Sequence, residues 1–241
     1  MLIELTIMYK ELKERAYEAN MAINKAGLVV LTWGNVSEYD RNLNAIAIKP
    51  SGVSYDEMKP EHMVIIDPEG SIIEGKLTPS SDTATHLVLY KNFSKACGVV
   101  HIHSPFATAF AQAKRPIPCF GTTHADVFYG EIPVTDSMTE PEIKNNYERE
   151  TGKVIVRCFE ERKLSPDSIP AVLVASHGPF IWGTSGAKAV ENAITLEAVA
   201  AMAHHSLQLQ PHLTHISNHL LDKHFLRKHG SNAYYGQSTK G

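Results

Sequence analysis

The chain has 241 residues, of which 43% are hydrophobic and 20% are charged, so it can bury a sizeable core without disulfides or structural metals. Its formal net charge of -3 comes from 23 basic and 26 acidic residues with no basic arm or acidic tail. This balance gives no reason to expect a nucleic-acid or membrane partner. The three cysteines form no C-x-x-C pair, and the early charges and lack of a long apolar run predict a cytoplasmic protein.

The first half of the chain predicts one long helix and several short strands. Apolar residues recur at helical spacing over residues 4–26, and Gly27 is a plausible end of this helix. Short β-prone runs predict strands at residues 28–31, 45–48, 63–66 and 71–73, the last two joined as a hairpin around residues 67–70.

The second half of the chain alternates helices with two strands. The small polar residues Ser80, Ser81 and Asp82 can cap the start of a helix that runs to about residue 92. Further helices are predicted at residues 108–114, 139–163, 187–208 and 217–228, and strands at residues 98–103 and 171–176. Because there is no clean βαβ rhythm, we expect one domain, residues 1–241, with helices on both faces of a mixed sheet.

Three histidines are candidate metal ligands. His101 and His103 lie in the predicted strand 98–103, where alternate side chains share a face about 7 Å apart and can reach one ion. His177 ends the apolar strand 171–176, and strand ends are where α/β sheets collect their sites. Each feature alone is more often a surface or structural histidine. Together, three imidazoles would form the catalytic type of zinc site, with one position left for substrate.

Small polar turns are candidate anion sites. Ser80 and Ser81 stand at a helix start, where hydroxyl and backbone N–H groups can bind a phosphate, and Asp82 would then face the metal. The simpler interpretation of Asp82 is a helix cap. Lys49-Pro50-Ser51-Gly52 and Gly34-Asn35 are similar turns, and none of them is specific singly.

Two further features allow opposite interpretations. Asp126 follows a polar cluster and is a candidate general acid or base, or else a solvated loop carboxylate. The tail with Tyr234 and Tyr235 could reach into a site or form a packed end. Five other histidines lack paired spacing and are interpreted as surface or packing residues, namely His204, His205, His212, His215 and His219.

Seven motifs that stand in order along the chain carry a resemblance to a known family. They are TWGNVS at 32–37, KPSGV at 49–53, PSSDTATH at 79–86, VVHIHS at 99–104, GTTHADVFYG at 121–130, HGPFIWG at 177–183 and DKHFLRKHGSNAYYGQ at 222–237. Over about residues 12–237 the chain resembles the L-ribulose-5-phosphate 4-epimerases, members of the class II aldolase superfamily. Seven ordered motifs are far more specific than any one of them.

The resemblance implies a fold, an assembly and a set of site residues. The fold is a three-layer α/β/α sandwich around a mixed, mostly antiparallel sheet, and the assembly is a fourfold homotetramer with active sites at subunit interfaces. The cofactor is one divalent metal ion per subunit, zinc in the first place, with manganese or another divalent ion as the alternative. The implied metal ligands are Asp82, His101, His103 and His177, and the implied phosphate- and substrate-binding residues are Gly34, Asn35, Lys49, Ser51, Gly52, Ser80, Ser81 and His224.

The resemblance also assigns an acid/base pair. Asp126 matches the family's acid/base carboxylate, and Tyr235 matches its partner, which is expected to come from a neighbouring subunit. Glu148 and Arg227 match supporting positions near the interface, as His224 does.

The implied reaction inverts carbon 4 of L-ribulose 5-phosphate, a small sugar phosphate, to give D-xylulose 5-phosphate. Removing the hydrogen of carbon 4 is unfavourable, because no adjacent carbonyl stabilises the carbanion. Breaking the bond between carbons 3 and 4 places the charge beside the carbonyl as an enediolate, which a divalent Lewis acid favours. Rotation of the glycolaldehyde phosphate and re-addition, with a proton carrier on each face, give the epimer.

Two other functions are open. One is a class II aldolase of the L-fuculose-phosphate type, although in that group the P-S-S motif is usually followed by Glu, where this chain has Asp82. The other is a non-catalytic interaction module like the adducin head domain, against which the intact His101, His103 and His177 argue.

Overall fold

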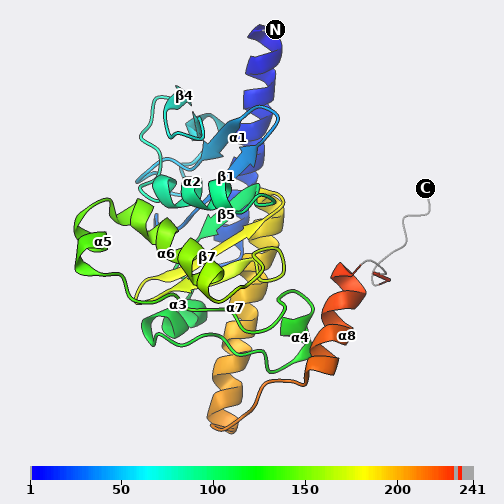
Figure 1. Cartoon of the computed structure of the whole chain (residues 1–241). Coiled ribbons are helices and arrows are strands. Elements are labelled where there is room, and N and C mark those ends of the chain that lie inside the picture. Colours follow the sequence, from blue (N-terminus) through cyan, green and yellow to red (C-terminus); the bar gives the residue numbers. More distant parts are fainter. Residues whose placement is uncertain (1, 231–232, 235–241) are drawn as a thin grey trace.

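The computed structural model describes residues 2–230 and 233–234, and its centre is one seven-stranded sheet (Figure 1). In sheet order the strands are β4 (Ile72–Glu74), β3 (Val64–Ile66), β2 (Ala45–Ile48), β1 (Asn35–Asp40), β5 (Gly98–His101), β7 (Gly178–Gly183) and β6 (Ala171–Val174). Every pairing between these neighbours is antiparallel. The parallel contact recorded in the described chain is an isolated bridge between Val134 and Leu173.

Helices cover both faces of this sheet. They are α1 (Leu2–Lys25), α2 (Thr83–Asn92), α3 (Pro105–Gln112), α4 (Thr122–Ala125), α5 (Glu140–Lys144), α6 (Tyr147–Glu161), α7 (Gly186–Leu209) and α8 (Asn218–His229), with a 3-10 turn η1 at Pro60–His62. α1, α3 and α7 pack on one face, and the α2–α6 pair covers the other (Figure 1). The three-layer α/β/α sandwich predicted from the sequence is therefore confirmed.

The strand register decides which side chains face the α2–α6 layer. Trp182 of β7 packs against Phe93 and Phe159, with ring centroids 4.7 and 5.3 Å apart, so its side chain faces this layer. Phe180 lies two residues earlier in β7 and shares that face. Since His101 of β5 is the cross-strand partner of Phe180, its imidazole points to the same side. The fold thus presents His101 to the N-terminal ends of the helices in that layer.

One predicted strand and one predicted helix differ from the structure. Residues 28–31 do not form a strand: residues 28–30 have no regular structure, and the chain then turns over residues 30–33, where Leu31 has a φ of 55° and the N–H of Trp33 donates to the carbonyl of Val30. The predicted helix 139–163 is two helices, α5 and α6. They are separated at Asn145, whose ψ of -108° lies outside the helical range.

Strand ends near the candidate site also differ from the predictions. β5 ends at His101, so His103 follows the strand, and β6 ends at Val174, so His177 lies in the turn to β7. β1 was not predicted, and neither was β7, because Gly178 and Pro179 indicated a chain break. Pro179 is tolerated there because it lies near the start of a strand.

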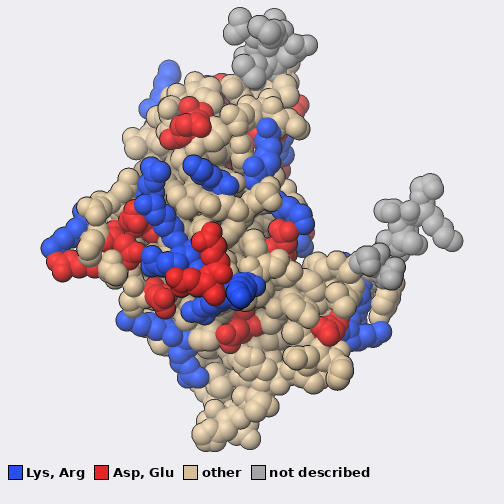
Figure 2. All heavy atoms as spheres, viewed as in Figure 1, with Lys and Arg blue, Asp and Glu red and all other residues tan. Residues whose placement is uncertain are grey.

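α8 stands apart from the three layers and packs mainly against α4 (Figure 1). It exposes Leu220 and Leu226, and the neighbouring α7 exposes Met202 and Leu209. On the face drawn in Figure 2, basic and acidic side chains are interleaved rather than gathered into a patch of one sign. Within the described residues, no helix has both the length and the apolar character needed to cross a membrane.

Candidate metal centre

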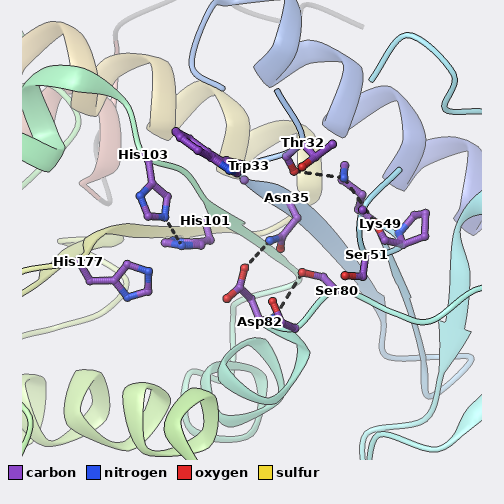
Figure 3. Close-up of a pocket in the computed structure, with 14 residues that line it drawn as sticks. Thr32, Trp33, Asn35, Lys49, Ser51, Ser80, Asp82, His101, His103 and His177 are labelled. Atoms are coloured by element: carbon purple, nitrogen blue, oxygen red, sulfur yellow. Dashed lines mark hydrogen bonds between the residues drawn. The ribbon is translucent and has the colours of Figure 1, made fainter. Parts of the chain in front are cut away.

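A pocket of about 510 Å³ opens beside the start of β1 and the end of β5 (Figure 3). It is lined by Thr32, Trp33, Gly34, Asn35, Lys49, Pro50, Ser51, Gly52, Ser80, Ser81, Asp82, His101, His103 and His177. All four predicted metal ligands are in this set, as are all the predicted substrate-binding residues except His224. The chain therefore folds so that five separate motifs meet at one place.

Three imidazoles converge at one end of the pocket. One ring nitrogen from each of His101, His103 and His177 lies within 4.8 Å of the other two. The Nε2 atoms of His101 and His103 are 3.0 Å apart. Two nitrogens that are each about 2.1 Å from one ion are separated by about 3 Å, so this pair is already spaced as two ligands of a common ion.

His101 is held with its Nε2 free for the pocket. Its ring stacks on Phe180, with centroids 4.1 Å apart and an interplanar angle of 11°. Its Nδ1 lies 3.0 Å from the carbonyl oxygen of Pro179, which can accept only if Nδ1 carries the proton. The backbone thus selects the tautomer whose Nε2 lone pair can bind a cation.

The other two histidines come from connections rather than from strands. His177 lies in the β6–β7 turn, where Ser176 takes a φ of 62° and the N–H of His177 donates to the carbonyl of Val174. His103 is followed by the start of α3, where the carboxylate of Glu197 accepts hydrogen bonds from Ser104 Oγ and two backbone N–H groups. This cap on α3 fixes the segment that carries His103.

Asp82 joins the triad to the rest of the pocket. It is the N-cap residue of α2, and its Oδ2 accepts a hydrogen bond of 2.7 Å from Nδ2 of Asn35. Figure 3 shows its carboxylate between Asn35 and the imidazoles. Its side chain makes no capping bond to α2, so the simple cap interpretation of the sequence was wrong.

The pKa shifts of this cluster favour neutral imidazoles beside an ionised carboxylate. Burial lowers the pKa of His101 to about 3 and also lowers the pKa values of His103 and His177. Burial alone would raise the pKa of Asp82, but His101, His86 and the amide of Asn35 outweigh it and hold that pKa below its ordinary value. Neutral imidazole and carboxylate are the forms that bind metal ions.

The donor set of this cluster fits a divalent metal ion. His101, His103 and His177 would each supply a ring nitrogen, and Asp82 is the nearby carboxylate in the pocket lining. Three neutral imidazoles with a carboxylate suit a borderline cation such as zinc better than calcium or magnesium, which prefer oxygen ligands.

Two small polar loops form the opposite end of the pocket. Residues 49–52 and 79–82 are joined by a bridge between Pro50 and Pro79, and the N–H of Ser80 donates to the carbonyl of Lys49. Lys49 itself is 2% exposed, and burial lowers its pKa. Its Nζ donates to the carbonyl of Val53 at 2.9 Å. A cation, hydroxyls and a helix start together make a suitable site for an anion.

Gly34 lets the wall of the pocket approach β5 closely. Its φ is +83°, and a Cβ at this position would lie 2.8 Å from Val29 Cγ1 and 3.0 Å from the carbonyl oxygen of His101. Any other residue would push the Trp33–Asn35 segment away from the histidines, so glycine is required here both for conformation and for space.

Asp126 and His224 are not brought to this pocket within the chain. Asp126 lies at the end of α4, where its carboxylate accepts hydrogen bonds from Arg227 at 2.8 Å and from His224 Nδ1 at 2.9 Å, both on α8. Burial would raise the pKa of Asp126, but these two partners and Lys228 lower it overall, so the carboxylate stays ionised. Tyr235 lies outside the described residues.

Comparison with known proteins identifies the family. A family model described as the class II aldolase and adducin N-terminal domain matches residues 14–204. The chain belongs to this family. The histidine cluster and the small polar loops described above therefore belong to a member of the class II aldolase family.

Several solved structures share the fold. An L-fuculose 1-phosphate aldolase has a TM-score of 0.75 and 21% identity, over 89% of this chain and 94% of that one. The L-fuculose 1-phosphate aldolase from Glaciozyma antarctica PI12 has a TM-score of 0.72 and 18% identity, over 92% and 82%. YgbL from Escherichia coli, titled a putative aldolase/epimerase/decarboxylase, has a TM-score of 0.70 and 21% identity, over 90% and 98%.

Several residues around the site were not predicted from the sequence. Thr32 and Trp33 line the pocket although they were noted only as part of a motif, and Tyr147 places its hydroxyl 3.3 Å from His177 Nδ1. His86 lies fully buried behind Asp82 and bonds to Ser37. Spacing gave no signal for Tyr147, because it reaches the site only through the packing of α6 on α2.

Proposed function

We propose that this protein is a divalent-metal-dependent L-ribulose-5-phosphate 4-epimerase that interconverts this ketose phosphate and D-xylulose 5-phosphate. The observation that carries the proposal is one pocket that combines the histidine triad with the polar loops 49–52 and 79–82 (Figure 3). A sugar phosphate has the matching pattern, because its vicinal oxygens lie at one end and its phosphate at the other. We propose zinc as the ion, since imidazole nitrogen suits it best, with manganese as the alternative.

The residues of the pocket have separate tasks in this reaction. The bound ion would act as a Lewis acid that favours negative charge next to the substrate carbonyl. A base removes the proton of the carbon-4 hydroxyl, the bond between carbons 3 and 4 breaks, and its electron pair passes to carbon 3. Lys49 and the serines of the two loops hold the phosphate, so that the aldehyde fragment rotates without leaving. The bond then re-forms on the opposite face, and an acid returns a proton to the carbon-4 oxygen.

We assign the acid and the base to Asp126 and Tyr235 and infer that a neighbouring subunit supplies them in a homotetramer. The separation of the Asp126 cluster from the pocket supports this arrangement. The exposed leucines of α8 also support it, because apolar surface of this kind marks protein contacts. The three cysteines are free, which supports a reducing compartment, and we place the protein in the cytoplasm.

A class II sugar-phosphate aldolase is the second candidate. The observation that favours it is the fold shared with two L-fuculose 1-phosphate aldolases, together with the family match, whereas Asp82 in place of the usual Glu argues against it. Cleavage without inversion needs a proton carrier on one face of the substrate alone. An interaction module related to adducin is less well supported, since such a module has no need of a preformed histidine triad.

Product analysis separates these functions. Zinc-loaded protein is incubated with L-ribulose 5-phosphate, and both D-xylulose 5-phosphate and glycolaldehyde phosphate are measured over time. We expect D-xylulose 5-phosphate as the main product and no product after chelation. Rapid net release of glycolaldehyde phosphate would instead establish the aldolase, and protein that binds no metal and turns over neither way would point to the interaction module.

A further inference from the structure

The hydroxyl of Tyr147 lies beside the metal centre without belonging to the pocket lining. Its Oη is 3.3 Å from Nδ1 of His177, and the two rings are tilted by 31° with centroids 6.1 Å apart. If Nε2 of His177 is to bind a cation, Nδ1 of the neutral ring must carry the proton and can donate it to the Tyr147 oxygen. Tyr147 can therefore accept the Nδ1 hydrogen bond of His177, as the backbone carbonyl of Pro179 accepts that of His101.

Packing between α6 and α2 fixes the position of Tyr147. It is the first residue of α6, and Oγ1 of Thr151 donates to its carbonyl at 2.9 Å. In the same turn, Oγ1 of Thr85 in α2 donates to the carbonyl of Glu148 at 2.6 Å. The starts of α2 and α6 are thereby tied together, which places Tyr147 and Asp82 at the same end of the helix layer.

His177 needs such a support more than His101 does. His101 is buried and stacks on Phe180 at 4.1 Å, whereas His177 is half-buried, lies in a turn and keeps 6.1 Å between its ring and that of Phe180. An imidazole in a turn can rotate, and a rotated ring presents Nδ1 or a carbon atom to the ion instead of Nε2. A hydrogen bond to Nδ1 removes this freedom.

We propose that Tyr147 is a positioning residue of the metal centre, whose hydroxyl fixes the orientation and the tautomer of His177. The inference rests on the metal site of the proposed function but is independent of which sugar phosphate is converted. Loss of such a hydrogen bond weakens metal binding by about 10- to 100-fold in other sites. Because 3.3 Å is just beyond the usual range of about 2.7–3.2 Å, we expect the lower end of this scale.

The test measures zinc affinity by calorimetry or by competition with a chelating dye, without substrate. We expect Tyr147→Phe to raise the zinc Kd about 10-fold. Tyr39→Phe is the matched control, because it removes a hydroxyl that bonds to Asn44 at an exposed site on β1, and its Kd should equal that of the parent. The visible spectrum of the cobalt-substituted protein should change in Tyr147→Phe and not in Tyr39→Phe.

A double-mutant cycle shows whether the effect passes through His177. In a His177→Ala background, Tyr147→Phe should have no further effect on zinc affinity, because the ring it orients is gone. An unchanged Kd in the single variant, an equal loss in both backgrounds, or a parent that binds no divalent ion would each overturn the inference. A parent that binds zinc but lacks epimerase activity would overturn the proposed function and leave this role of Tyr147 intact.

Discussion

Asn35 and Asp82, the first residue of β1 and the N-cap residue of α2, are joined by a hydrogen bond of 2.7 Å from Nδ2 to Oδ2. The amide oxygen of Asn35 is buried and has no hydrogen-bond partner among the described residues. The amide therefore orients the carboxylate at the expense of an unpaired acceptor. This cost is expected at a residue selected for the site rather than for stability.

Replacement of Asn35 should weaken metal binding while having little effect on the stability of the fold. We expect Asn35→Ala to weaken zinc binding about 10-fold, because Asp82 loses its orienting donor. The free energy of unfolding of the metal-free protein should fall by no more than about 1 kcal/mol, because the variant also loses the unpaired oxygen. Calorimetry and urea unfolding measure the two quantities. Asn92→Ala, at the exposed end of α2, is the control, and an unchanged zinc affinity in Asn35→Ala would refute the orienting role.

Mixed oligomers test whether active sites are shared between subunits. His103→Ala removes a proposed metal ligand and Asp126→Asn a proposed acid/base group, and each variant alone should be inactive. When the two are co-expressed in equal amounts, about a quarter of the interface sites combine an intact residue 103 with an intact residue 126 from the neighbour. We expect about a quarter of the parent activity.

The same experiment has a clear negative outcome. If Asp126 served the pocket of its own chain, no mixed site would be complete and the co-expressed protein would remain inactive. Tyr235→Phe offers a second partner for His103→Ala. It should slow turnover while leaving the zinc content unchanged.

Lys49 should contribute to substrate binding but little to stability. Its side chain is buried, and its ammonium group contacts the carbonyls of Thr32, Pro50 and Val53. In Lys49→Met, relief of the buried charge and loss of these hydrogen bonds offset each other, so we expect unfolding to change by less than about 1 kcal/mol. The KM for the sugar phosphate should rise at least about 10-fold.

Steady-state kinetics and inhibition by inorganic phosphate measure this effect. Lys91→Met, an exposed position on α2, should match the parent in both assays. A variant at position 49 that kept its KM would show that the phosphate is bound elsewhere.

The loss of native-state stability at acid pH should depend partly on His124. It is buried in α4, its Nε2 donates to the carbonyl of Gly130 at 2.7 Å, and burial lowers its pKa to about 4. The unfolded chain binds a proton near its ordinary pKa of about 6.5, but the native state does not, so native stability is complete above this pH and falls as the pH drops towards 4.

Unfolding of metal-free protein between pH 6.5 and 4 tests this dependence. We expect His124→Asn to lose less stability than the parent, with a difference that grows to about 3 kcal/mol at the acid end. His86 and His101 also have lowered pKa values, so the parent alone reports on several histidines at once. The difference between the parent and His124→Asn reports on His124. His219→Asn, at an exposed position, should follow the parent curve, and parallel curves for His124→Asn and the parent would contradict the assignment.

The sequence predicted the residues of the pocket better than their local structure. Small polar turns and the H-x-H pattern are chemical signals, so Ser80, Ser81 and His101 could be selected without coordinates. The irregular path of residues 28–31 could not be predicted, because their apolar composition is that of a strand, whereas in the structure Val29 packs beside Gly34 near the end of β5.

Contacts between distant helices were also beyond prediction from the sequence. Tyr147 reaches His177 only because Thr85 and Gly152 allow α6 to dock closely on α2. Asp126, at the end of α4, was expected at the site together with His224 of α8, but a single chain places both elsewhere. No sequence pattern distinguishes a residue of the same subunit from one of its neighbour.

The histidines of the candidate metal centre come from two parts of the chain, the end of β5 and the β6–β7 turn. An ion held by both parts would cross-link the middle of the sheet, and the unfolded chain would lack this site. Free ion at about 100 times its Kd would add about 2.7 kcal/mol to the unfolding free energy. The thermal midpoint should therefore track the supply of the ion, so that a cell starved of it would lose this protein to proteolysis as well as its activity.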